Sequence, residues 1–146
     1  MRGVFVGDGE LDGRLRETAN QMNAPVSLVG FKNQSELPAI YAAADVLVLP
    51  STQESWGLVV NEAMACGTPA IVSNAVGCAD DLIETGDTGY RYRVGDIDSL
   101  AAAIKAMLST AASDGVRQAL KEKMRHYSLR IAVAGILAAR EYGRKH

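Results

Sequence analysis

The sequence is poor in the residues that hold metal ions and disulfide bridges. Only two of its 146 residues are cysteines, Cys66 and Cys78, and only two are histidines, His126 and His146. Neither pair stands at a spacing typical of a metal site, so we expect no metal and no other cofactor. Two unpaired thiols are typical of the reducing cytosol, and we therefore expect a cytoplasmic location.

Long apolar runs and a strong excess of one charge are also lacking. No apolar run reaches the roughly 20 residues of a bilayer-spanning helix, and residues 1–3 begin no secretory signal. The net charge of −2 gives no basic field for nucleic acid. A terminal basic cluster, Arg140, Arg144 and Lys145, permits at most a peripheral contact with anionic lipid.

Composition and patterning predict one globular α/β domain over residues 1–146, of ordinary hydrophobic (48%) and charged (22%) content. Short apolar runs predict strands at residues 4–6, 26–29, 46–49, 70–72 and 90–94. Segments of helical periodicity predict helices at residues 10–22, 36–44, 57–66, 96–109, 113–126 and 129–143. The alternation favours a Rossmann-like, doubly wound parallel sheet, which binds ligands beyond the carboxyl ends of its strands.

The stretch Glu54–Pro69 is the most informative part of the chain. It reads ESWGLVVNEAMACGTP and lies between two predicted strands, as a loop followed by a helix. The backbone N–H groups of the first helical turn, Gly57, Leu58 and Val59, have no partner inside the helix. Together with the positive end of the helix dipole, they suit a phosphate or diphosphate. Gly57 has no side chain to keep such a ligand away.

Two carboxylates flank this helix start. Glu62 lies about one turn into the helix, and helical side chains lean toward the N-terminus, so its carboxylate can accept hydrogen bonds from a vicinal diol such as a ribose. Glu54, in the loop, can do the same for a second hydroxylated ring. Two acids would repel a phosphate, which makes them hydroxyl acceptors rather than phosphate ligands. The alternative is that both are ordinary solvated acids.

The longer run PSTQESWGLVVNEAMACGTPAIVS resembles the signature of the retaining group 1 (family 4) glycosyltransferases of the GT-B fold. In that family two glutamates separated by seven residues bind a nucleotide sugar, and Glu54 and Glu62 match this spacing. Gly57, Ala63, Gly67 and Pro69 fall on the other expected positions. The resemblance implies the C-terminal, donor-binding domain of a hexosyltransferase, which transfers a sugar from a nucleotide diphosphate sugar to an acceptor hydroxyl.

The resemblance also implies roles for single residues. Glu54 would be the catalytic residue and hold hydroxyls of the transferred sugar, and Glu62 would hold the ribose. The rest of the implied donor site consists of Ser55, Trp56, Gly57, Leu58, Val59, the glycine turns at Gly7, Gly30 and Gly77, and Phe31 beside the nucleobase. A core position for Phe31 is the alternative. Cys78 departs from the family, which has a second glycine there.

About half of a family enzyme is missing from this resemblance. The acceptor-binding N-terminal domain is absent, and so are the first strand of the C-terminal domain and the following basic residues that neutralise the diphosphate. We therefore expect a partner N-terminal domain, and little or no activity from the chain alone. The missing strand is central in a sheet of order 3-2-1-4-5-6, so its two neighbours either pair directly or pair with another chain, as in a homodimer.

One alternative from another class is left open: a non-catalytic module, which binds a nucleotide or acts as an interaction partner completed by a separate N-terminal half. Nicotinamide or flavin binding is disfavoured, because Asp12 occupies the place of the third glycine after Gly7 and Gly9. A nucleotide-sugar epimerase of the same fold lacks the second acid–base group that it needs.

Overall fold

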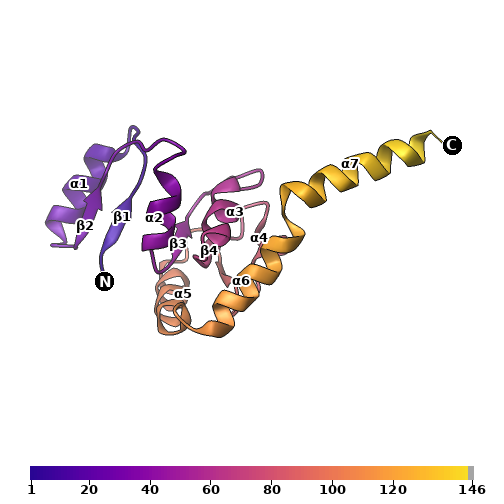
Figure 1. Cartoon of the computed structure of the whole chain (residues 1–146). Helices are drawn as coiled ribbons and strands as arrows, with labels where there is room; N and C mark the ends of the chain where they lie inside the picture. Colours follow the sequence, from indigo (N-terminus) through magenta and orange to yellow (C-terminus); the bar gives the residue numbers. More distant parts are fainter. Residues whose placement is uncertain (145–146) are drawn as a thin grey trace. The chain divides into compact units, whose positions relative to one another are not determined.

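The computed structural model describes residues 1–144 (Figure 1). Lys145 of the predicted basic cluster, and His146, lie outside the described residues. The chain divides into two compact units, the first ending at Leu37 and the second beginning at Pro38, and each is described by itself. The single domain expected over residues 1–146 stays a prediction.

The first unit is a small β-α-β arrangement. Strand β1 (Gly3–Phe5) pairs in parallel with β2 (Val26–Leu28), and helix α1 (Asp12–Gln21) connects them. The loops after the two strands meet, because the Gly7 amide donates to the Gly30 carbonyl at 2.9 Å. Both glycines have positive φ (124° and 70°), a conformation that glycine adopts without strain. The structure thus brings the two predicted glycine turns of this unit together.

The second unit contains a three-stranded parallel sheet of order β3-β4-β5. Its strands are β3 (Leu47–Leu49), β4 (Ala70–Ser73) and β5 (Gly89–Tyr92). Helix α2 (Leu37–Ala43) precedes β3, helix α3 (Leu58–Ala65) joins β3 to β4, and the short helix α4 (Ala79–Leu82) lies between β4 and β5. Helices α5 (Ile97–Thr110), α6 (Asp114–His126) and α7 (Leu129–Gly143) follow.

The core of the second unit lies on the central strand. All four residues of β4 are buried, as expected for a parallel strand covered on both faces. Helix α3 contacts β3, β4 and α6, whereas α5 contacts β4 and β5 (Figure 1). The largest side chains with less than 2% exposure come from these elements and from α4; among them are Met64, Ile71, Leu82, Met107 and Leu120.

The structure confirms the Rossmann-like α/β class with parallel strands and flanking helices. Every predicted helix and strand is present, with ends shifted by a few residues at most, whereas the four-residue α4 was not predicted. Within the units, β1 and β3 each pair with the strand that follows through one helix, the local pairing that βαβ units make. Direct pairing of β1 with β3, which lie in different units, stays a prediction. Pairing with another chain stays a prediction.

Helix α7 carries an apolar face that is largely exposed. None of its residues is buried, and Leu129, Ile136 and Tyr142 are 87%, 70% and 68% exposed. Among residues 1–144, neither α7 nor any other helix is long and apolar enough to cross a membrane.

Shortening Met107 to alanine tests the assignment of the core. Met107, on α5, is fully buried, so Met107→Ala should lower the free energy of unfolding by about 2–5 kcal/mol through lost burial and a residual cavity. Leu108→Ala is the control, because the neighbouring Leu108 is 36% exposed. Its expected loss of unfolding free energy is below about 1 kcal/mol. Urea denaturation of both variants measures the difference, and equal losses would contradict this core.

Candidate functional site

The loop after β3 and the loop after β4 are joined by backbone hydrogen bonds. The Glu54 amide donates to Ala75 O at 3.1 Å, and the Gly77 amide donates back to Glu54 O at 2.9 Å. The Cys78 amide donates to Trp56 O at 2.9 Å and continues the ladder. Both loops follow the carboxyl ends of their strands, where parallel sheets place ligand sites. Glu54 is therefore fixed at this edge by a second loop.

Gly77 makes this joining of the loops possible. A Cβ atom on Gly77 would lie 2.0 Å from the Ser55 carbonyl oxygen, a distance that real Cβ atoms never show. Only glycine therefore permits this approach of the two backbones. Gly77, predicted as a donor-binding residue, has a demonstrable structural role, and its contact with a ligand stays a prediction.

Gly57 sets the start of helix α3. It is the N-cap residue, with φ 96° and ψ 60°, which is the left-handed conformation. A Cβ atom there would lie 3.0 Å from Val76 Cγ1 and 3.1 Å from Leu49 Cδ2. The backbone conformation and the close packing both select glycine at this position.

The amides of the first helical turn are free of protein partners. Within residues 1–144, the N–H groups of Gly57, Leu58 and Val59 donate to no protein acceptor, and the first amide to be satisfied is that of Val60, which donates to Gly57 O. Gly57 itself is buried, but the Leu58 residue is 68% exposed. These donors and the helix dipole favour an anion here.

Both predicted acids are half-buried, and each already accepts one hydrogen bond. Glu54 Oε1 accepts from the Trp56 amide at 3.3 Å. Glu62 Oε2 accepts from the Tyr41 hydroxyl at 2.9 Å. The second oxygen of each carboxylate has no protein donor in the described part of the chain. Each acid is thus held in place and keeps one oxygen for a further donor.

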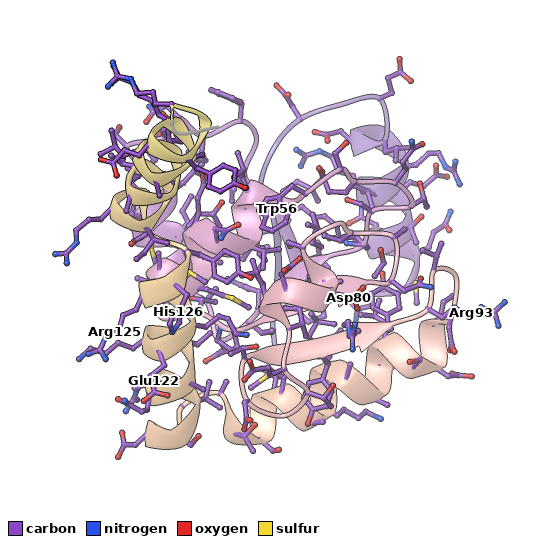
Figure 2. The ribbon with its side chains drawn as sticks, turned by 90° about the vertical axis from the view of Figure 1, so that its right-hand side faces the viewer. Trp56, Asp80, Arg93, Glu122, Arg125 and His126 are labelled. Atoms are coloured by element: carbon purple, nitrogen blue, oxygen red, sulfur yellow. The ribbon has the colours of Figure 1, made fainter. Side chains whose placement is uncertain are left out.

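Trp56 is held by two contacts that the sequence did not predict. Its indole N–H donates to Asn61 Oδ1 at 2.8 Å, and its ring lies 6.3 Å from the Tyr127 ring, tilted by 36°. Figure 2 labels Trp56 within this unit, together with Glu122, Arg125 and His126 on α6. The contacts of Trp56 connect the start of α3 to the end of α6.

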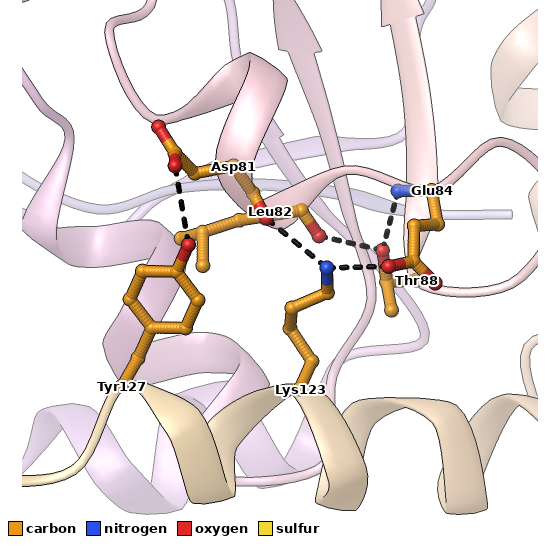
Figure 3. A network of polar contacts seen from close by, with 6 residues as sticks. All are labelled: Asp81, Leu82, Glu84, Thr88, Lys123 and Tyr127. Atoms are coloured by element: carbon orange, nitrogen blue, oxygen red, sulfur yellow. Dashed lines mark hydrogen bonds and ion pairs between the residues drawn. The ribbon is translucent and has the colours of Figure 1, made fainter. Parts of the chain in front are cut away.

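A polar network joins the end of α6 to α4 and to the segment that follows α4 (Figure 3). The Tyr127 hydroxyl donates to Asp81 Oδ1 at 3.2 Å. Lys123 donates to the Asp81 carbonyl at 3.1 Å and forms an ion pair with Glu84. Thr88 is fully buried and donates to Leu82 O at 2.7 Å. This network fixes the position of Tyr127 and therefore of the ring that contacts Trp56.

Cys78 does not obstruct the helix start, although it replaces the glycine of the family signature. Its side chain is fully buried, with Sγ 3.9 Å from Gly57 O. Burial raises the pKa of the Cys78 thiol to about 11, and the nearby carboxylates of Asp81 and Glu54 act in the same direction. The thiol is therefore a neutral core group at physiological pH.

Neither of two cavities in the structure includes the predicted acids. One of about 810 Å³ lies between the end of α3, α6 and the start of α7, and is lined by Met64, Leu120, Arg125 and Ile131 among others. The second, of about 360 Å³, lies between α1 and β2 of the first unit. Glu54, Glu62 and the free amides thus line neither cavity. In residues 1–144, no three His, Cys, Asp or Glu side chains are grouped so that they could hold a metal ion.

The remaining predicted residues, Gly7, Gly30 and Phe31, lie in the first unit, whereas the other predicted site residues lie in the second. Phe31 is 70% exposed, so its alternative position in a core is wrong. Sequence reasoning missed Tyr41, Asn61 and Tyr127. Asn61 and Glu62 adjoin on α3, but nothing in the sequence pairs Tyr41 or Tyr127 with the loop.

The chain is similar to known glycosyltransferases in sequence and in structure. Residues 1–130 match the family described as glycosyl transferases group 1. The chain is 32% identical over 136 residues to the sulfoquinovosyl transferase SQD2 of Arabidopsis thaliana, covering 91% of this chain and 26% of that protein. It is 38% identical to the UDP-Gal:α-D-GlcNAc-diphosphoundecaprenol α-1,3-galactosyltransferase of Escherichia coli, covering 69% of this chain and 26% of that protein.

Solved structures of glycosyltransferases have the same fold as this chain. The HepE protein of Anabaena in complex with UDP superposes with a TM-score of 0.80 at 26% identity, covering 95% of this chain and 41% of that one. The chain belongs to the group 1 glycosyltransferases, and its fold is that of GT-B enzymes. It spans about a quarter of the length of the curated relatives it matches.

Substitution of Gly77 tests the contact between the loops. Gly77→Ala should lower the free energy of unfolding by about 1–3 kcal/mol or more, since the new Cβ displaces the Ser55 carbonyl. Gly115→Ala is the matched control: its nearest neighbour is 3.9 Å away and it lies in α6, so stability should stay equal or rise by up to about 1 kcal/mol. Urea denaturation compares them. An unchanged Gly77→Ala variant would show that the loops do not meet as described.

Alkylation tests the state of Cys78. With a pKa near 11, about one Cys78 thiol in a thousand is a thiolate at pH 8, and the side chain is enclosed. Iodoacetamide should therefore modify only the partly exposed Cys66 in the folded protein, and both thiols in urea. Peptide mass spectrometry locates the label; rapid native labelling of Cys78 would contradict its burial.

Proposed function

We propose that this chain binds the donor of a retaining glycosyltransferase, a nucleotide diphosphate sugar, at the start of helix α3. The observation that carries the proposal is the set of unpartnered amides at Gly57, Leu58 and Val59, at the positive end of a helix. A diphosphate supplies acceptor oxygens and negative charge for these donors. Two acids with one available oxygen each flank the set.

The two acids take different parts of the donor in this proposal. Glu62 accepts hydroxyl hydrogens of the ribose, because it lies on the helix beyond the diphosphate-binding turn. Glu54 accepts hydroxyl hydrogens of the transferred sugar, because its loop lies before that turn. Ser55 and Trp56 complete the loop that carries Glu54.

The reaction in this proposal needs no protein nucleophile. The bond between the anomeric carbon and the leaving diphosphate breaks while the acceptor oxygen bonds to the same face of that carbon. The acceptor proton passes to a leaving phosphate oxygen, so configuration is retained. The amides at residues 57–59 stabilise the charge that develops on the leaving group, a contribution worth about 10²–10³ in rate for one such donor in other enzymes.

The similar proteins support a nucleotide sugar as the ligand. HepE of Anabaena has been solved with UDP, and also with UDP-glucose in a structure that superposes with a TM-score of 0.68. The name of the Escherichia coli relative likewise specifies a UDP-sugar. We therefore choose UDP and UDP-glucose as the probes for this chain.

Calorimetry on two alanine variants tests the division of roles. Glu62→Ala should weaken UDP binding about tenfold or more, because hydrogen bonds to a charged acceptor contribute about 1.5–3 kcal/mol. Glu54→Ala should leave UDP binding within about threefold but abolish discrimination among UDP-sugars. Glu122→Ala, on the exposed face of α6, is the control. Equal losses in both site variants would remove the division of roles.

A second candidate is a non-catalytic nucleotide-binding or interaction module that needs a partner N-terminal domain. The observation that favours it is that Glu54 and Glu62 line neither of the two cavities described above. Hydrolysis and transfer of the donor, measured for the chain alone and mixed with a family N-terminal domain, distinguish the two. Nucleotide binding without turnover in either case would favour the module.

A further inference from the structure

Tyr41 connects helix α2 to the candidate site. Its side chain is 8% exposed, and its hydroxyl donates to Glu62 Oε2 at 2.9 Å. Its carbonyl oxygen accepts from the buried Thr68 hydroxyl at 2.6 Å, next to the start of β4. Tyr41 is therefore held both at its backbone and at its hydroxyl. The hydroxyl bond reaches Glu62, which the proposed function places against the ligand.

This contact restricts Glu62 in a specific way. A glutamate side chain has several rotamers of similar energy, and ordering it costs about 1.5–2 kcal/mol. Tyrosine has few rotamers, so a buried tyrosine provides a fixed donor. With Oε2 taken, Oε1 is the oxygen that has no protein donor within residues 1–144. The pair thus prepares one carboxylate oxygen for a ligand before the ligand arrives.

Tyr41 also remains a donor over the whole physiological range. Burial, followed by the hydrogen bond and the negative charge of Glu62, raises the pKa of Tyr41 to about 12. The phenol is neutral at neutral pH, and its proton points to the carboxylate. It adds no negative charge beside the diphosphate-binding turn.

We infer that Tyr41 is a positioning residue for donor binding, which orients Glu62 so that its free oxygen accepts the ribose hydroxyls of a nucleoside diphosphate. This inference rests on the proposed function, in which Glu62 takes the ribose. Tyr41 itself does not touch the ligand. Its removal therefore acts only through Glu62, and only on ligands that carry the hydroxyls.

Calorimetry on the full chain with UDP and with 2′,3′-dideoxy-UDP tests this inference. Tyr41→Phe keeps the ring and the Thr68 bond but removes the donor. We expect it to weaken UDP binding about five- to thirtyfold, and to leave dideoxy-UDP binding within about twofold. Tyr92→Phe is the matched control: Tyr92 is 7% exposed on β5, its hydroxyl has no hydrogen bond among residues 1–144, and both affinities should be unchanged.

Glu62→Ala and the double variant Tyr41→Phe/Glu62→Ala distinguish the positioning role of Tyr41 from the proposed role of Glu62. If Glu62→Ala weakens UDP binding and Tyr41→Phe adds nothing to it in the double variant, the inference stands. If Glu62→Ala weakens binding but Tyr41→Phe equals the unmodified chain, the positioning role is wrong and the proposed function survives. If Glu62→Ala has no effect, or the unmodified chain does not bind UDP, both are wrong. Equal losses of UDP and dideoxy-UDP affinity in Tyr41→Phe would show a merely structural role and overturn the inference.

Discussion

The second unit depends on the close approach of two backbones at Gly77 and Ser55. Because no side chain stands at Gly77, the loop after β4 lies against the loop after β3, and three backbone hydrogen bonds join them. The pairing extends the sheet's parallel order past the strand ends, as the bridge between Glu54 and Val76 shows. The backbone of the loop that carries Glu54 is thereby held against a second loop beyond the strand ends.

The same contact prepares the helix start. Val76, in the second loop, packs against Gly57, and Gly57 turns the chain into α3 in a left-handed conformation. An ordinary N-cap side chain would satisfy one or two of the first amides. Here the N-cap residue makes no side-chain hydrogen bond, which leaves those donors available. The isolated helix is thus less stable than it would be with a serine or aspartate cap.

The secondary structure and the free amides of the candidate site could be predicted from the sequence alone. The strands and helices follow from periodicity, and the amides at residues 57–59 follow from the position of Gly57 before an apolar helix. The structural role of Gly77 could not be predicted, because it depends on a carbonyl 22 positions earlier in the chain. The contacts of Tyr41 with Glu62 and of Tyr127 with Trp56 span 21 and 71 positions, and only the packing of helices brings them together.

The arrangement also shows how two carboxylates can lie beside a site that favours anions. An unpaired carboxylate near the helix start would oppose a diphosphate. Here the Trp56 amide donates a hydrogen bond to Glu54 and the Tyr41 hydroxyl donates one to Glu62. Each hydrogen bond stabilises part of the negative charge of its carboxylate. One oxygen on each remains, which is the chemistry of a hydroxyl acceptor. A cation would need ligands grouped around one point, whereas these oxygens are held by separate donors on separate elements. In the proposed function, the acids therefore act as hydroxyl acceptors, and the free amides between them in sequence remain for the phosphates.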